Sequence, residues 1–249
     1  MSTLKNKVAI VTGASKGIGA GIAKAYGNAG ASVVVNYASD KEGAQRVVDE
    51  IVSNGGKALA VQGSVAVSED VKNLFKQAKE AYGQIDILVN NAGVFKFDPI
   101  ESITEAEFHR QFNTNVLGTI LATQQAVQDF GTTGGSIINV GSVISSNPSA
   151  HSVVYSATKG AVDTIAIALS KELGSRNIRV NTIAPGGVDT EGSQTMGMIG
   201  SDMEKQIVAD TPLGRIGQPN DIARVAVFLA SDDAAWVNGE KINVSGGLR

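Results

Sequence analysis

The chain of 249 residues is 43% hydrophobic and 18% charged, which fits one large globular domain or two small ones. Its net charge of −3, with no cluster of lysine and arginine, argues against a protein that binds nucleic acid by neutralising phosphates. The sequence contains no cysteine, so disulfides, thiolate catalysis and cysteine-ligated zinc are excluded, and we expect no metal site.

The first residues of the chain carry no recognisable targeting signal. Met1 to Lys7 lead into a strand-like segment without an apolar core or a small-residue cleavage site. The longest apolar runs have the length of strands and fall far short of a membrane span. We therefore expect a cytoplasmic protein that does not contact a membrane.

Short β-branched runs alternate with helical stretches along the chain. Strands are predicted at 8–12, 32–36, 58–61, 85–89, 136–140, 178–183 and 240–244. Helices are predicted at 18–28, around 47–52, and at 68–82, 105–130, 153–173 and 221–230. Uninterrupted apolar strands that alternate with helices are typical of a parallel sheet with helices on both faces. The connections are short, so the prediction is a single doubly wound α/β domain over residues 1–249.

One stretch, from Gly186 to Gly200, is rich in glycine, serine, threonine and methionine and shows no clear period. Long irregular loops in compact domains are usually lids or binding loops. We expect a substrate lid over about residues 186–212.

The turn between the first strand and the first helix, Thr12 to Gly19, carries three glycines. Glycines allow a tight turn and a close backbone approach, and the N-terminus of the helix offers free N–H groups to a pyrophosphate. A tight strand-to-helix turn alone would also favour glycine. Its place in the first βα unit of the chain favours a dinucleotide site.

The end of the second strand distinguishes the two nicotinamide cofactors. A carboxylate there would bind the ribose 2′-hydroxyl and repel a 2′-phosphate, but Asn36-Tyr37-Ala38-Ser39 contains no acid before Asp40. Lys16 in the glycine turn, together with Ser39, is suited to a 2′-phosphate. These residues favour NADP(H) over NAD(H); the alternative is that Lys16 is a solvated surface lysine.

Tyr155 and Lys159 stand four residues apart at the start of a predicted helix and so share one helical face. The ammonium is expected to lower the pKa of Tyr155, which would make the phenol a usable general acid or base near neutral pH. Ser142 follows a strand at the carboxyl edge of the sheet and could hold a substrate oxygen beside Tyr155. Taken singly, the pair could be a surface packing pair and Ser142 a turn residue.

In combination, these residues resemble the short-chain dehydrogenase/reductase family over essentially the whole chain. The family's glycine motif matches Thr12 to Gly19, and its Asn-Asn-Ala-Gly segment matches Asn90 to Gly93. Its Pro-Gly turn matches Pro185-Gly186. The resemblance implies a Rossmann-type fold and a homotetramer in which the two long helices, about 105–130 and 153–173, pack between subunits.

The family's four catalytic positions fall on Asn115, Ser142, Tyr155 and Lys159. The resemblance implies hydride transfer between C4 of the nicotinamide and a carbonyl carbon, with Tyr155 handling the proton of the oxygen. It also implies that Lys159 bonds the nicotinamide ribose and that Asn115 holds a water of a proton relay. From the residues alone, Asn115 reads as a buried amide satisfied by backbone groups.

The residues expected to contact the cofactor come from the glycine turn, the ends of the strands and the Pro-Gly turn. Val188 and Thr190 match family positions that contact the nicotinamide amide and the phosphate. The expected set is Gly13, Ser15, Lys16, Gly17, Ile18, Gly19, Asn36, Tyr37, Ala38, Ser39, Ser64, Val65, Asn91, Ala92, Gly93, Tyr155, Lys159, Pro185, Gly186, Val188 and Thr190. Ser64 stands where the family commonly has an aspartate that bonds the adenine amino group, so adenine is expected to bind more weakly or through water.

Three substrate classes fit the resemblance: free ketones or secondary alcohols, 3-oxoacyl groups on a carrier protein, and glucose. A carrier protein is acidic and calls for basic residues near the site, but residues 128–135 carry none, and Arg176 and Arg179 could be surface charges. We therefore favour a small free carbonyl compound. Expected pocket residues are Val94, Phe95, Val143, Ile144, Gly187, Met196 and Met198, although ordinary packing would explain the methionines equally well. A non-catalytic dinucleotide sensor is disfavoured because such proteins lose the tyrosine or the lysine.

Overall fold

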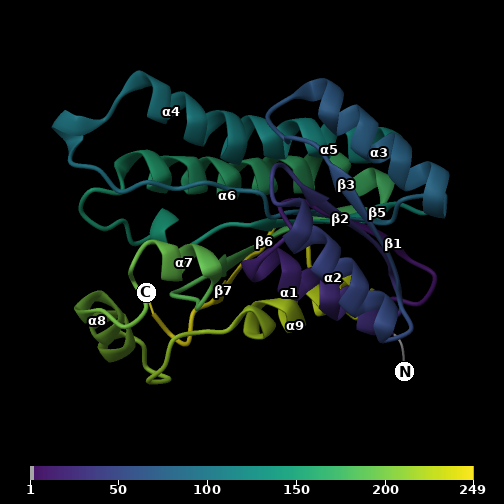
Figure 1. Ribbon diagram of the computed structural model, residues 1–249. Helices are drawn as coiled ribbons and strands as arrows, with labels where there is room; N and C mark the ends of the chain where they lie inside the picture. Colours follow the sequence, from purple (N-terminus) through teal and green to yellow (C-terminus); the bar gives the residue numbers. More distant parts are fainter. Residues whose placement is uncertain (1–2, 249) are drawn as a thin grey trace.

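A parallel sheet runs through the middle of the molecule in the computed structural model, which describes residues 3–248 (Figure 1). Its strand order is β3-β2-β1-β4-β5-β6-β7. The strands are β1 (Val8–Val11), β2 (Ser32–Tyr37), β3 (Lys57–Gln62), β4 (Ile87–Asn90), β5 (Gly135–Val140), β6 (Ile178–Pro185) and β7 (Lys241–Val244). The order reverses at β1, whose neighbours are β2 and β4. In such sheets ligands bind at the carboxyl ends of the strands near this reversal.

Helices cover both faces of the sheet, as the sequence predicts. In Figure 1, α3 to α6 lie above the sheet and α1, α2 and α9 below it, while α7 and α8 stand at the carboxyl ends of the strands. The helices are α1 (Gly17–Asn28), α2 (Lys41–Ser53), α3 (Ser68–Tyr82), α4 (Glu105–Phe112), α5 (Gly118–Asp129), α6 (Val153–Leu173), α7 (Glu191–Thr195), α8 (Asp202–Asp210) and α9 (Pro219–Ala230). Short turns of 3₁₀ helix are η1 (Ile100–Ser102), η3 (Val143–Ser145), η4 (Gly174–Arg176) and η5 (Asp232–Ala234).

Two apolar cores result from the alternation of side chains along the strands. In β1, Ala9 and Val11 pack into the core under α1, α2 and α9, whereas Val8 and Ile10 pack into the core under α3, α5 and α6. Because both faces are buried, the strands read as continuous apolar runs. The predicted single-domain, doubly wound fold is confirmed.

The helix predicted over 105–130 is wrong as one continuous helix. It divides into α4, a π-helical segment η2 (Asn113–Leu117) and α5. Inside η2, the Asn115 amide is held by the backbone of Val94 and by Thr158. A π turn adds a single residue to the helical spacing, so the apolar period hardly changes and does not reveal it.

The predicted lid region is more regular than its composition suggests. Thr190 and Ser193 form a reciprocal cap that starts α7, and Ser201 caps α8. Both helices are short, which is why no helical period was visible in the sequence. Within residues 3–248, no helix is long and apolar enough to cross a membrane.

Candidate active site

A cavity of about 980 Å³ opens at the carboxyl ends of the strands, between the glycine turn and the α7–α8 region. All residues predicted to contact the cofactor line it, as do Ser142, Tyr155 and Lys159. The predicted pocket residues line it as well, including Phe95, Met196 and Met198. Asn115 does not: it lies buried behind the wall, next to Thr114. The structure thus brings together segments from β1, β2, β4, β5 and β6 that are far apart in the sequence.

The glycine turn is built for close approach of a ligand to the backbone. Gly13 and Gly17 have positive φ angles of 60° and 58°, which favour glycine. A Cβ on Gly13 would lie 2.8 Å from the Cα of Ala92, so a side chain there would displace the neighbouring loop. The Asn91 amide donates to the carbonyls of Thr12 and Gly13, both at 2.9 Å, and fixes the turn to the end of β4.

Helix α1 starts at Gly17, and its first residues line the cavity. Lys16 precedes it without a side-chain cap. Instead, a carboxylate oxygen of Glu191 on α7 accepts a hydrogen bond of 2.8 Å from the Gly17 N–H. A negative group at this helix end shows that the turn attracts anions, because free N–H groups and the helix dipole act in the same direction.

Some residues at the end of β2 stabilise the fold through hydrogen bonds, whereas others are exposed at the cavity. The Asn36 amide is occupied by backbone groups of Gly13, Val61 and Gly63, so it holds the turn in place. By contrast, Lys16, Ala38 and Ser39 are exposed at the cavity. Asp40 caps α2 by accepting from the Gly43 N–H at 2.9 Å. The first acid after β2 is therefore engaged by a helix N-terminus.

Ser142, Tyr155 and Lys159 meet above the end of β5. Ser142 caps the η3 turn that follows β5, and its hydroxyl accepts from the Ile144 N–H at 3.2 Å. Lys159 is buried, and its Nζ donates to the Val140 carbonyl at 2.8 Å. The same Nζ lies 5.7 Å from the centroid of the Tyr155 ring.

Burial controls the ionisation of this group. It raises the pKa of Tyr155 to about 12, and a hydrogen bond with Ser142 acts in the opposite direction. Burial also lowers the pKa of Lys159 to about 8, while the charge of Asp163 raises it. The pKa of Tyr155 is thus raised rather than lowered, contrary to the expectation from the sequence, because loss of solvent around the phenol is the largest cause.

Asn115 is fully occupied by its neighbours. Its side-chain oxygen accepts from the Val94 N–H at 2.8 Å, and its nitrogen donates to the Val94 carbonyl at 2.8 Å and to the Thr158 hydroxyl at 3.0 Å. These bonds fix the loop after β4 and helix α6 on either side of the π segment. The Asn115 side chain thus connects two segments of the cavity wall, the loop after β4 and helix α6.

Two aromatic rings line the cavity close to the ring of Tyr155. The centroids of Phe95 and Phe97 lie 5.8 Å and 5.9 Å from that of Tyr155, and 6.1 Å from each other. Each phenylalanine is 38% exposed. Phe95 was predicted from the sequence but Phe97 was not, although the spacing of two residues in an extended segment places both on one side. Met203 and Ile207, which α8 adds to the wall with helical spacing, were not predicted either.

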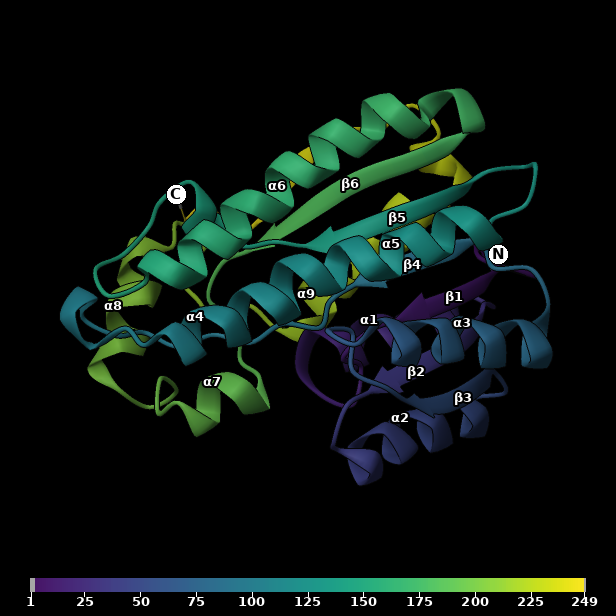
Figure 2. The ribbon, with the colours of Figure 1, turned by 90° about the horizontal axis from the view of Figure 1, so that it is seen from above.

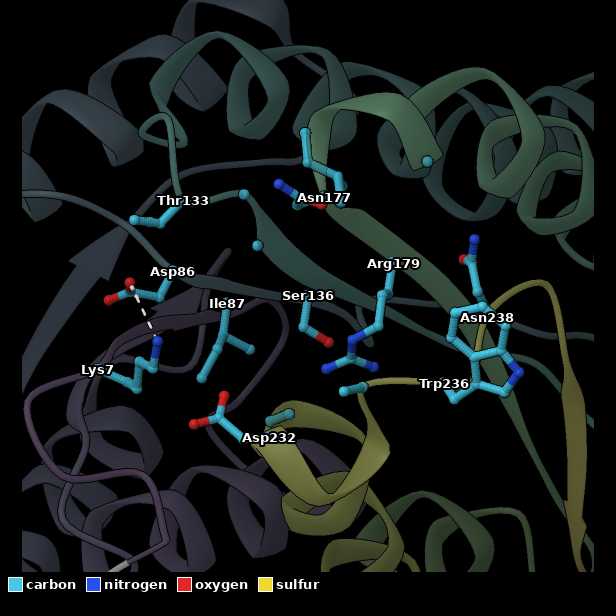
Figure 3. A pocket seen from close by; sticks show the side chains of 16 residues that line it. Lys7, Asp86, Ile87, Thr133, Ser136, Asn177, Arg179, Asp232, Trp236 and Asn238 are labelled. Carbon is cyan, nitrogen blue, oxygen red and sulfur yellow. Dashed lines mark ion pairs between the residues drawn. The ribbon is translucent and has the colours of Figure 1, made fainter.

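A second cavity, of about 620 Å³, lies at the amino ends of β4, β5 and β6 (Figure 3). Among its charged groups, Lys7 pairs with Asp86 at 3.8 Å, and Arg179 donates to the carbonyls of Leu229 and Ser231. It contains none of the residues proposed for catalysis or cofactor binding. Apart from Asn115, the predicted site residues thus line the cavity at the carboxyl edge of the sheet and not this one.

A Rossmann-type sheet with a glycine turn and a Ser–Tyr–Lys group at its carboxyl edge defines an oxidoreductase that interconverts C=O and CH–OH groups. Residues 13–249 match the family model described as enoyl-(acyl carrier protein) reductase. The chain belongs to the short-chain dehydrogenase/reductase family.

Named relatives cover almost the whole chain. An uncharacterized oxidoreductase of Methylorubrum extorquens is 55% identical, with 100% of both chains covered. Elsinochrome reductase 1 of Elsinoe fawcettii is 40% identical, with 98% of this chain and 95% of the relative covered. The crystal structure of an angucycline C-6 ketoreductase with bound NADP is similar with a TM-score of 0.92 and 38% identity, covering 99% of this chain and 96% of that one.

Proposed function

We propose that this protein is an NADP(H)-dependent ketoreductase that converts a small ketone to the secondary alcohol, with Tyr155 as the general acid. The observation that carries the proposal is the single cavity that joins the glycine turn to Ser142, Tyr155 and Lys159. The glycine turn at Gly13 and the N-terminus of α1 suit a pyrophosphate, since both bring backbone groups close to a ligand. When bound, the nicotinamide supplies the hydride.

The protein's own residues deliver the proton. With its pKa at about 12, Tyr155 is protonated at neutral pH and can donate to a carbonyl oxygen. The Ser142 hydroxyl is placed to hold the same oxygen. Below pH 8 the Lys159 ammonium is charged, and its position 5.7 Å from the ring centroid stabilises the phenolate left behind. Asn115 supports this arrangement from behind the wall.

The preference for NADP(H) over NAD(H) is supported by the end of β2. Asp40 is engaged by the N-terminus of α2, while Lys16 and Ser39 remain exposed at the cavity, where a 2′-phosphate finds a cation and a hydroxyl. The similar angucycline ketoreductase carries NADP in its crystal structure.

The residues that line the cavity favour a ketone with a flat apolar group as the substrate. Phe95 and Phe97 line the cavity with their ring centroids 5.8 Å and 5.9 Å from that of Tyr155, and aromatic groups pack well on such rings. The cations beside this wall are already paired, Lys96 with Asp98 at 2.9 Å and Arg110 with Glu107 at 2.8 Å. This pairing favours a free ketone over one carried by an acidic protein. We infer that the 186–212 region, with α7 and α8, acts as the lid over this substrate.

Consumption of NADPH with a panel of aryl ketones, aliphatic ketones and a carrier-bound 3-oxoacyl group tests the proposal, with NADH in parallel. Tyr155→Phe is expected to lower kcat by about 100-fold or more, the contribution of a positioned general acid. Tyr82→Phe, which changes another partly buried tyrosine on α3, is the matched control. Full activity of Tyr155→Phe would show that the proton comes from another group.

A further inference from the structure

Asp163 lies on α6 one turn beyond Lys159 and is not part of the catalytic group described above. One of its carboxylate oxygens, Oδ2, accepts a hydrogen bond of 2.6 Å from the Ser145 hydroxyl. The same oxygen forms an ion pair of 2.8 Å with Lys241 on β7. The two charged side chains are 17% and 22% exposed, so this is a largely buried ion pair that joins α6 to the last strand.

The link through Ser145 reaches the catalytic serine. The Ser145 hydroxyl also contacts the carbonyl of Ser142, at 2.8 Å, across the η3 turn. Lys241 donates to the Ser145 hydroxyl as well, and to that of Ser146 at 2.7 Å. The turn that carries Ser142 is thus fixed from α6 and from β7 at once.

The other oxygen of Asp163, Oδ1, points toward the strand that binds Lys159. It is buried and has no hydrogen-bond partner among residues 3–248. A Cβ on Gly141 would lie 3.2 Å from it, which places this oxygen against the residue that follows Val140. The Val140 carbonyl accepts the hydrogen bond of Lys159. Residues four apart on a helix share a face, so the negative charge of Asp163 faces the buried ammonium, and it acts to raise the pKa of Lys159.

The remaining charged groups near α6 are engaged elsewhere or lie at the far end of the sheet. On α4, Glu107 pairs with Arg110 and Glu105 with His109. On η4 and β6, Arg176 and Arg179 donate to backbone carbonyls. Elements η2 and η3 present only neutral side chains. Among the described residues, Asp163 is therefore the charged group that acts on Lys159, and Lys241 is its ion-pair partner.

We propose that Asp163 is a positioning residue for the reaction, which holds the Ser142 turn through Ser145 and keeps the Lys159 ammonium charged, while Lys241 limits how strongly its carboxylate acts on Lys159. The inference rests on the proposed ketoreductase function for its role in catalysis. It predicts opposite effects for the two members of the ion pair. Removing the carboxylate leaves Lys159 without a negative charge nearby, which should lower its pKa. Removing the Lys241 cation leaves the negative charge of Asp163 unpaired, so that it acts more strongly on Lys159 and should raise its pKa.

The test follows the titration of Lys159 by NMR in the full chain labelled at its lysine side chains, with Lys159→Met to assign the resonance. In Asp163→Asn, the midpoint is expected to fall by about one pH unit, the lower end of what a close opposite charge contributes. In Lys241→Met it is expected to rise. The alkaline limb of kcat for ketone reduction should move in the same directions, and Asp163→Glu should restore the wild-type midpoint. Lys72→Met, at an exposed pair with Glu69 on α3, should change neither.

Midpoints that move in the same direction in Asp163→Asn and Lys241→Met, or that do not move, would overturn the proposal, since an anion and a cation that act on Lys159 shift its pKa in opposite directions. If Asp163→Asn does not fold, a rise of the midpoint in Lys241→Met and an unchanged midpoint in Asp163→Glu still support the proposal, and a fall in Lys241→Met overturns it. The NMR titration needs no substrate. Wild-type protein that reduces no ketone would refute the ketoreductase function and the catalytic role of Asp163, and opposite midpoint movements would then support only its action on Lys159.

Discussion

Burial drives the two ionisable groups of the site toward their neutral forms. The pKa of Tyr155 rises to about 12 and that of Lys159 falls to about 8, both mainly through loss of solvent. A neutral phenol is the form that a general acid needs. A charged lysine, in contrast, has to be maintained against its surroundings, and the carboxylate of Asp163 contributes to that.

Replacing Lys159 by methionine should change how stability depends on pH. The folded protein releases the Lys159 proton near pH 8 and the unfolded chain near pH 10.5, so between these values the unfolded state binds more protons and stability rises with pH. Between pH 8 and 10 the wild type should gain about 2 kcal/mol of unfolding free energy relative to Lys159→Met. Urea unfolding at both pH values measures this difference. A constant difference between the two proteins would mean that Lys159 titrates normally.

Phe97 should contribute to the choice of substrate. Its ring lies 5.9 Å from that of Tyr155 and is partly exposed in the cavity. An aromatic contact of this kind is worth about 0.5–1.5 kcal/mol, so Phe97→Ala should raise KM for an aryl ketone by about two- to tenfold and leave an aliphatic ketone nearly unchanged. Phe228→Ala on α9, with similar exposure, serves as the control. Equal effects on both ketones would place Phe97 outside the substrate contact.

At the scale of elements, the strands could be predicted because both faces of the sheet are buried and their sequences are continuous apolar runs. The π segment η2 could not, since one extra residue within residues 105–129 leaves no periodic mark. Helices α7 and α8 were missed for a different reason: their caps at Thr190 and Ser201 are local signals, but five and nine residues are too few to show a period. The ion pair of Asp163 with Lys241 depends on the register of β7, which the sequence does not show.

Helix α7 also determines what occupies the N-terminus of α1. Glu191 accepts from the Gly17 N–H at 2.8 Å, at the turn proposed for the pyrophosphate, so the carboxylate and the cofactor would compete for one positive region. Removing the charge in Glu191→Gln should therefore tighten NADPH binding by about two- to fivefold, the effect of roughly 0.3–1 kcal/mol at a helix terminus. Fluorescence titration of NADPH gives the Kd. Glu204→Gln on α8, which bonds the Gly200 N–H at 2.6 Å, is the control, and weaker binding by Glu191→Gln would argue against competition.

For the whole molecule, parallel pairing explains why the site could be predicted from motifs far apart in the sequence. All strands point the same way, so Gly13, Asn91, Ser142 and Pro185 arrive at one edge from the ends of β1, β4, β5 and β6. In Figure 2 this edge carries α7 and α8. The order of the motifs therefore predicts their meeting point, whereas the side-chain network between α6, η3 and β7 requires the packed structure.

The layer formed by α4, α5 and α6 should also join copies of the chain, as we infer from the homotetramer that the family resemblance implies. This layer, which faces the viewer in Figure 2, exposes Leu117 and Ile167 at 41% and 48%. Burying such a side chain between subunits is worth about 1.5–3 kcal/mol, so Leu117→Glu with Ile167→Glu should convert the assembly to smaller species in sedimentation velocity. Val52→Glu, 52% exposed on α2 in the opposite layer, should leave it intact. A wild-type protein that sediments as a monomer would refute the homotetramer, and a double variant that sediments like the wild type would place the interface on another face.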